Sequence, residues 1–188
     1  MKILALCCTF ALAFAGLATV SVRGQDNMNM PGDKKPLLSP AAKTEASIDG
    51  AKITIKYNSP AMRGRTIMGG LVLYGQVWRT GANPATSLVT TGDLKIGTLT
   101  VPAGSYTVYT LPAAPGTPWL LIINKQTGQW GTEYKPDMDL GRTPLHYEKL
   151  PAPQESMTIN FDHTTPHSTE LHIKWETTDE SIKVESAK

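Results

Sequence analysis

The chain has 188 residues, with 18 basic and 16 acidic side chains and two cysteines. Both cysteines, Cys7 and Cys8, lie in an apolar N-terminal run, so the rest of the chain has no thiol for catalysis, metal binding or a disulfide. Without Lys2 and Arg23 the charges balance at sixteen of each sign. This balance argues against nucleic acid as a partner, because it gives no long-range attraction to polyanions.

Residues 1–24 have the anatomy of a signal peptide: Lys2, an apolar run over 3–20 and then small residues. A retained membrane anchor is the alternative, because the run approaches the length that crosses a bilayer. The early position and the polar stretch that follows favour cleavage. We therefore expect a secreted or periplasmic protein with no membrane contact after cleavage. Residues 25–37 lack periodicity and are expected to form a flexible linker.

Short alternating segments fill the expected domain, residues 38–186. The first two are joined at Asp49-Gly50, a dipeptide that favours a tight hairpin turn because both positions tolerate positive φ. The run Trp119–Ile123 is apolar throughout, which predicts a central strand covered on both faces. The expected strands are 46–48, 53–57, 87–91, 94–101 with a break at Gly97, 105–111, 119–123, 157–161, 171–175 and 182–184.

No window keeps a helical period over three turns. Many short strands spaced about ten residues apart, separated by Gly and Pro, indicate an all-β protein. We predict a single domain with an antiparallel β-sandwich or jelly-roll-like architecture. In this architecture Trp78 and Trp130 are expected to close the two ends of the core.

The segment Tyr57–Thr86 reads YNSPAMRGRTIMGGLVLYGQVWRTGANPAT and places three arginines among five glycines. A segment that only fills a hydrophobic core does not need so many arginines and glycines, so this composition indicates another role. It resembles the signature of a secreted bacterial family known as domain of unknown function 2911, and the resemblance continues through VPAGSYTVYTLP and NKQTGQWG. The matching residues are Tyr57, Pro60, Gly64-Arg65, Tyr74-Gly75, Val77–Asn83 and Ala85-Thr86. The resemblance implies a family but no activity.

Arginine presents a planar fork of donors that can hold a carboxylate or phosphate in bidentate fashion. On an extended backbone, Arg63 and Arg65 would point the same way. The candidate ligand-binding residues are Arg63, Arg65, Trp78, Arg79, Thr80, Asn83 and Thr86. The alternative is structural: Arg65 and Arg79 would form internal ion pairs with Asp93, Glu133 or Asp139.

Four aromatic side chains in or after this segment, Tyr74, Trp78, Trp130 and Tyr134, could stack on a sugar ring. The favoured interpretation is that the large aromatics are core residues, as expected above for Trp78 and Trp130. A metal site could use His163, His167 and His172 with a carboxylate, but their spacing matches no known metal signature. Exposed histidines explain this cluster more simply, so we expect neither a metal nor another cofactor.

No nucleophile elbow, zinc-binding HExxH or phosphate-binding glycine loop is present in the sequence. The leading hypothesis is therefore non-catalytic binding of a small anionic or carbohydrate ligand. One alternative is a hydrolase acting on cell-wall or polysaccharide material, since paired carboxylates can come from distant residues. The other is a structural envelope protein whose signature serves only folding.

Overall fold

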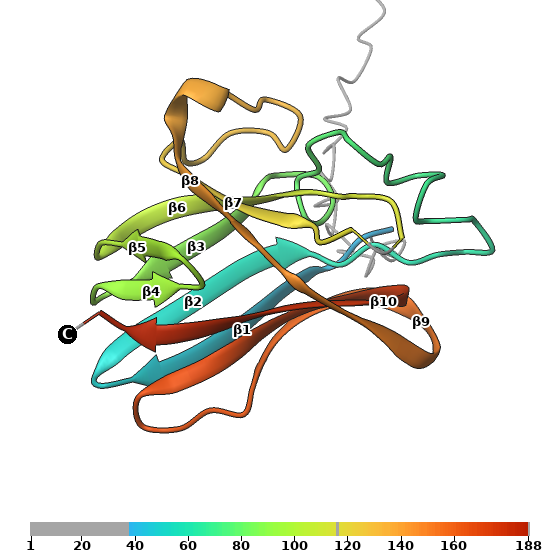
Figure 1. Cartoon of the computed structure of the whole chain (residues 1–188). Coiled ribbons are helices and arrows are strands. Elements are labelled where there is room, and N and C mark those ends of the chain that lie inside the picture. Colours follow the sequence, from blue (N-terminus) through green and yellow to red (C-terminus); the bar gives the residue numbers. More distant parts are fainter. Residues whose placement is uncertain (1–37, 116, 188) are drawn as a thin grey trace, which may run out of the picture. The chain divides into compact units, whose positions relative to one another are not determined.

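The computed structural model describes residues 38–115 and 117–187, so the proposed signal peptide and linker lie outside it. The described residues form two antiparallel sheets and no α-helix, which confirms the predicted all-β sandwich (Figure 1). One sheet has the order β1-β2-β3-β6-β7-β8 and the other β5-β4-β10-β9. The strands are β1 Ala41–Ile48, β2 Ala51–Asn58, β3 Thr86–Thr90, β4 Leu94–Ile96, β5 Leu99–Val101, β6 Gly104–Leu111, β7 Leu120–Asn124, β8 Asp139–Pro144, β9 His146–Asp162 and β10 Ser168–Ser186, with a 3-10 turn η1 at Pro136–Met138.

The hairpin of β1 and β2 forms at the predicted turn. Asp49 and Gly50 have φ values of 46° and 80°, and Ile48 pairs with Ala51 across them. Gly97, with φ 55°, separates β4 from β5 in the same way. Both turns follow from residue types that accept the left-handed region at low cost.

Strand β7 lies between β6 and β8 and is covered on both faces, as its unbroken apolar sequence predicted. Leu121 and Ile123 belong to the core between the sheets. Ile122 points the other way and is also fully buried. On that second face Tyr109 receives a hydrogen bond from Gln129 and packs edge-on against Tyr134, so the 125–138 segment covers this side of the sheet.

Strands β9 and β10 form a long hairpin that is bent back on itself (Figure 1). The register shifts on both sides of Glu176, whose φ is 55°. The bend brings Asp179 to the His172 ring, with 3.0 Å between Oδ1 and Nδ1, and Ser181 to the Glu170 carboxylate. His172 is therefore 9% exposed. The expectation that it faces solvent is wrong because the second limb of its own strand covers it.

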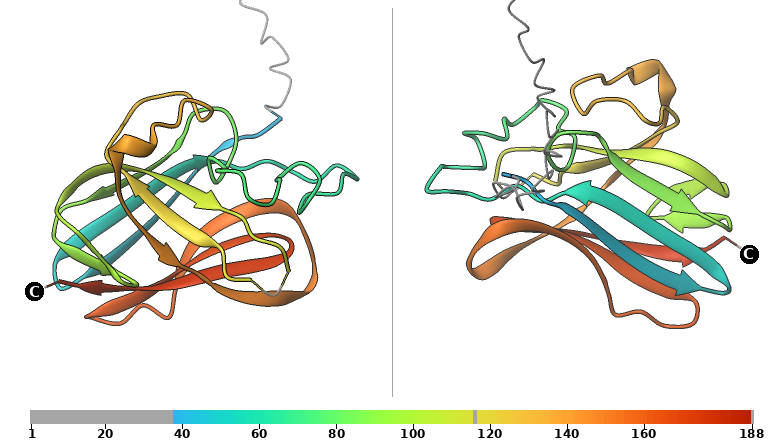
Figure 2. Two further views of the ribbon diagram at one scale, coloured as in Figure 1. Left: turned by 45° about the horizontal axis from the view of Figure 1, so that its top comes forward. Right: turned by 180° about the vertical axis from the view of Figure 1, so that it is seen from behind.

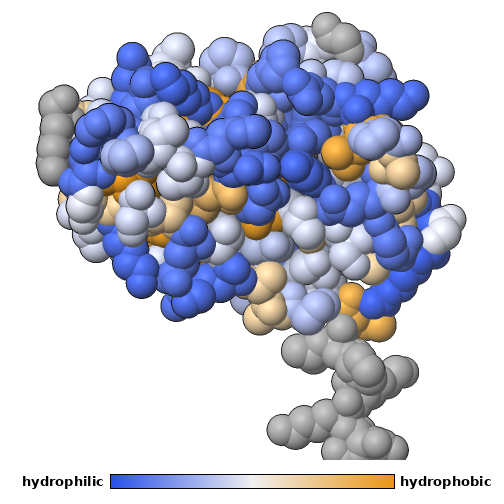
Figure 3. Space-filling model, turned by 90° about the horizontal axis from the view of Figure 1, so that it is seen from below, coloured by the Kyte–Doolittle hydropathy of each residue, from blue (hydrophilic) through white to orange (hydrophobic). Residues whose placement is uncertain are grey.

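The segment 59–85 makes only isolated bridges and loops out at one end of the sandwich (Figure 2). Viewed from below, the surface is mostly hydrophilic, with apolar atoms in small separate spots (Figure 3). Trp130 is 50% exposed, so the expectation that it closes the core is wrong. Within 38–115 and 117–187 no helix has the length and apolarity needed to cross a bilayer.

Candidate functional site

A cavity of about 360 Å³, here called the arginine cavity, lies where the 59–85 segment meets the end of the sandwich. Five of the seven predicted ligand-binding residues line it: Arg63, Arg65, Trp78, Arg79 and Asn83. The remaining wall residues, which sequence reasoning missed, are Leu38, Ser39, Pro60, Leu71, Gly81, Ala82 and Trp175. Trp175 comes from β10, and its inward place in an alternating strand was the only sequence signal for it.

Arg63 and Arg65 reach the cavity from a tight turn. The extended backbone expected for them is wrong, since Arg63 and Gly64 have φ values of 51° and 70°, and the Arg65 N–H donates to the Met62 carbonyl. Arg65 donates from Nε to the same Met62 carbonyl, at 2.9 Å, and from Nη2 to the Ala61 carbonyl, at 2.7 Å. Arg63 likewise donates to the Leu38 carbonyl. These neutral acceptors orient the two side chains without cancelling their charge.

Buried hydroxyl groups hold the loop from Trp78 to Thr86 against the sheet. Thr80 and Thr86 are both fully buried. The Thr86 hydroxyl donates to the Thr80 carbonyl at 2.8 Å, and the Thr80 hydroxyl lies 3.2 Å from that of Thr110 in β6. Backbone bonds join Trp78 to Thr110 in both directions. Thr80 and Thr86 therefore hold the loop in place, and neither lines the cavity.

Strained backbone conformations gather at this site. Thr80 and Asn83 have φ values of 52° and 61°, and Arg63 shares that region. A left-handed conformation costs a non-glycine residue roughly 1–3 kcal/mol, most for a β-branched one such as threonine. Such strain persists where the surrounding structure enforces it, and it is concentrated at binding sites.

Arg79 is half-buried, and its Nε has no hydrogen-bond partner among the described residues. No ion pair in the described part of the chain joins Arg63, Arg65 or Arg79 to an acidic residue. Asp139 pairs instead with Arg142, at 2.9 Å. The guanidinium groups of these arginines thus have no carboxylate partner in the described part of the chain, although the Glu155 carboxylate accepts the Arg63 backbone N–H at 2.8 Å.

The four candidate stacking aromatics do not converge. Trp78 stacks on Trp175, with 5.9 Å between ring centroids and an angle of 18°. Tyr74 lines a different cavity. Tyr134 donates to the Asp139 carboxylate at 2.6 Å, and its burial, together with that carboxylate, raises its pKa to about 12. Of these four, only Trp78 therefore lies beside the arginines.

The three histidines of the alternative metal site also have different surroundings. His167 bonds to Asp49, at 2.8 Å, and His172 is held by Asp179 inside the bent hairpin. His163 is exposed in the turn between the two strands. Among the residues that the structure describes, no group of three or more His, Cys, Asp and Glu side chains could hold a metal ion.

Fold and cavity together define a β-sandwich protein with an arginine-lined site built on its long loop segment. The chain belongs to the family described as Protein of unknown function (DUF2911), whose sequence pattern matches residues 39–184. This confirms the resemblance seen in Tyr57–Thr86. No curated protein and no solved structure matches the chain.

Gly131 does not line the arginine cavity, but a side chain added at this position would collide with Arg79, which does. A Cβ added at Gly131 would lie 2.1 Å from Arg79 Cδ and 2.8 Å from the Asn83 carbonyl oxygen. Gly131→Ala should therefore displace the Arg79 side chain and cost about 1–3 kcal/mol from overpacking. Gly128→Ala is the comparison for losing a nearby glycine: Gly128 has open space around it, so any loss of stability there comes from its φ of 79° and not from a clash. Urea denaturation of both variants, with NMR of the Arg79 Nε–H, checks this; an unmoved Arg79 resonance in Gly131→Ala would contradict it.

Proposed function

We propose that this protein binds a small organic anion in the arginine cavity without transforming it, and that it does so outside the cytoplasm. Three arginines line the cavity, and none of the described residues that line it is acidic. Its volume lies within the range of roughly 300–1,000 Å³ usual for ligand pockets. The proposed location rests on the signal-peptide pattern of residues 1–24.

The unpartnered Arg79 Nε is the observation that carries this proposal. A buried donor without a partner costs about 1–3 kcal/mol, and more when it belongs to a charged group. A bound carboxylate or phosphate would supply the acceptor and the opposite charge together. Arg63 and Arg65, already oriented by backbone carbonyls, lose little further freedom when an anion binds.

The ligand is expected to carry an apolar surface as well as a charge. Trp78 and Trp175 both line the cavity and stack on each other beside the guanidinium groups. Aromatic walls of this kind bind flat or ring-shaped molecules by contact with their carbon atoms. A sugar phosphate or a ring-bearing carboxylate combines both requirements.

The two alternatives have less support at this site. A polysaccharide hydrolase needs acidic side chains beside the scissile bond, and the described wall of the arginine cavity offers none. A purely structural role would lead us to expect arginine side chains paired with acids. Here the Arg63 and Arg65 side chains donate to backbone carbonyls, and the Arg79 Nε has no acceptor among the described residues.

The test replaces Arg79 with lysine, which keeps the charge but removes the bidentate fork. Glucose 6-phosphate should bind the wild-type protein and lose affinity by about tenfold in Arg79→Lys, while the free energy of unfolding changes by less than about 1 kcal/mol. Calorimetric titration and urea denaturation measure the two quantities. Arg142→Lys is the matched control, because Arg142 pairs with Asp139 away from the cavity.

Glucose and inorganic phosphate separate the contributions of ring and charge. We expect inorganic phosphate to compete with glucose 6-phosphate, and glucose alone to bind more weakly than either. Anion binding that is equal in wild type and Arg79→Lys would contradict the proposal, as would tight binding of glucose without its phosphate.

A further inference from the structure

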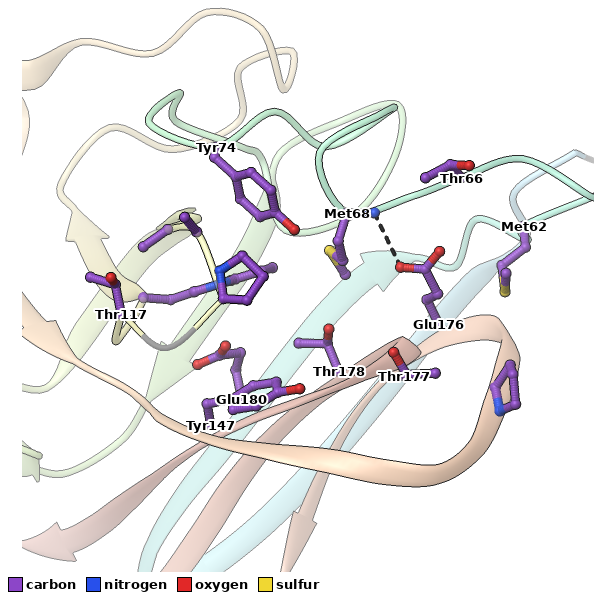
Figure 4. Close-up of a pocket in the computed structure, with 15 residues that line it drawn as sticks. Met62, Thr66, Met68, Tyr74, Thr117, Tyr147, Glu176, Thr177, Thr178 and Glu180 are labelled. Carbon is purple, nitrogen blue, oxygen red and sulfur yellow. Dashed lines mark hydrogen bonds between the residues drawn. The ribbon is translucent and has the colours of Figure 1, made fainter.

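A second and larger cavity, of about 490 Å³, lies on the other side of the 62–74 segment (Figure 4). We call it the carboxylate cavity. Its walls are mainly apolar or aromatic, with Tyr74, Trp119, Tyr147, Met62 and Met68 among them. Two acids from β10, Glu176 and Glu180, also line it, and no Lys, Arg or His occurs among its described lining residues. Its charge is therefore opposite to that of the arginine cavity.

Glu176 is positioned by the backbone. Its two carboxylate oxygens accept the N–H groups of Ile67 and Met68, each at 3.2 Å, and Figure 4 shows the second of these bonds. The left-handed conformation of Glu176 turns its side chain toward this loop at the bend of β10. The same acid thus fixes the wall of the cavity and gives it negative charge.

Glu180 is fully buried, and neither of its carboxylate oxygens has a hydrogen-bond partner among the described residues. Its neighbour Asp179 lies on the other face of the strand and is already bound by His172 and Lys174. A buried carboxyl group without partners is costly, and internal packing alone does not require it. Glu180 lines the carboxylate cavity with its oxygens covered, so a ligand there becomes its partner once the covering groups move aside.

We propose that the carboxylate cavity binds a small organic cation carrying an ammonium group. A cation there would sit close to two acids in surroundings that screen charge weakly, so the attraction would be strong. Tyr74, Tyr147 and Trp119 supply aromatic surfaces that attract ammonium groups, the quaternary kind above all. The methionine side chains fit around methyl groups of varied shape. This site is independent of the anion binding proposed for the arginine cavity.

The protonation of Glu180 links binding to pH. Burial, and the nearby Asp179 carboxylate, raise its pKa to about 8, so the empty cavity holds it protonated at neutral pH. The other titratable groups facing the cavity are Glu176, Tyr74 and Tyr147. A cation binds best when Glu180 is ionised, and it therefore displaces the proton.

The experiment uses choline, whose charge is fixed at every pH, and dimethylbutanol, which has the same shape with carbon in place of nitrogen. Choline should bind at least about tenfold more tightly than dimethylbutanol at pH 8. Its affinity should rise by about eightfold from pH 6 to pH 8, because the ionised fraction of Glu180, which binds the cation more tightly than the protonated form, grows over this range. NMR titration of the lining residues in the wild-type protein measures both.

Glu180→Gln keeps the shape of the side chain and should lose the pH dependence together with about tenfold in choline affinity at pH 8. Glu148→Gln, an exposed acid on the neighbouring strand β9, is the matched control and should bind as wild type does. Equal binding of choline and dimethylbutanol would overturn the proposal. So would a wild-type choline affinity independent of pH, or choline leaving the lining residues unperturbed.

Discussion

Between pH 5 and pH 8 the wild-type domain should lose roughly 3–5 kcal/mol of its free energy of unfolding, and the Glu180→Gln variant should not. Glu180 is fully buried, and its pKa is raised from 4.5 to about 8 by burial first and by Asp179 second. In the unfolded chain the same group ionises near its ordinary pKa. Keeping it protonated in the fold therefore costs about 1.4 kcal/mol more for each pH unit above 4.5.

The sign follows from which state holds the proton. Below pH 4.5 both states are protonated and Glu180 has no effect on stability; above about pH 8 both are ionised and the loss is complete. The other carboxyl groups with shifted pKa values, Glu45, Asp162 and Glu185, are shifted downward, so they affect stability below this window. The shifted tyrosine pKa values are raised above 10.

Urea denaturation at pH 5, 6, 7 and 8 measures the effect, and thermal melts should show a difference of roughly 10 °C between Glu180→Gln and wild type at pH 8. Glu148→Gln, at an exposed position on β9, should follow the wild-type profile. Parallel pH profiles for wild type and Glu180→Gln would show that Glu180 ionises normally in the folded protein.

Ile123→Asp should remove most or all of the stability of the domain. Ile123 is fully buried in β7, where its cross-strand neighbours are Val108 and Gly141, and it faces the core between the sheets. No basic side chain adjoins it in the ladder, so the new carboxylate would be buried without a partner. The expected cost is several kcal/mol, comparable with the total stability of a domain.

Ile123→Val is the matched control and should cost only about 0.5–1.5 kcal/mol, because it removes one methylene group and adds no charge. Circular dichroism and urea denaturation of both variants distinguish these outcomes. A stable Ile123→Asp variant would mean that the core face of β7 can open to solvent, although Ile123 is fully buried there against the core.

Much of this fold could be predicted from local patterns. Alternation located most strands, and Asp49-Gly50 and Gly97 marked turns because their residue types accept positive φ. The bend of β10 could not be predicted in this way. Glu176 adopts a left-handed conformation although glutamate is not a turn residue, and only tertiary packing enforces it. The first half of β9 was missed because Pro151 and Pro153 are typical of loops.

The arginine cavity was predictable in part, because nine of its twelve lining residues come from the continuous segment 59–85. Trp175 reaches the cavity, and acidic side chains stay away from its wall, because of how distant strands pack. Local sequence patterns do not predict this packing. Glu180 was missed although a signal existed. Ile182 and Val184 alternate in the expected strand 182–184 and belong to the core, and an alternation of two extends that inward face to Glu180.

Strand β10 also sets the order in which the protein can fold. Val184 of β10 pairs with Ile96 of β4, so the β4–β5 hairpin can join its sheet only after a strand about 90 residues further along the chain has been made. At ordinary rates of translation this delay lasts roughly 5–20 seconds. Until then the apolar side chains of Leu94 and Ile96 lack their sheet neighbour. Because β4 and β9 both pair with β10, the second sheet cannot be completed before β10 has been synthesised.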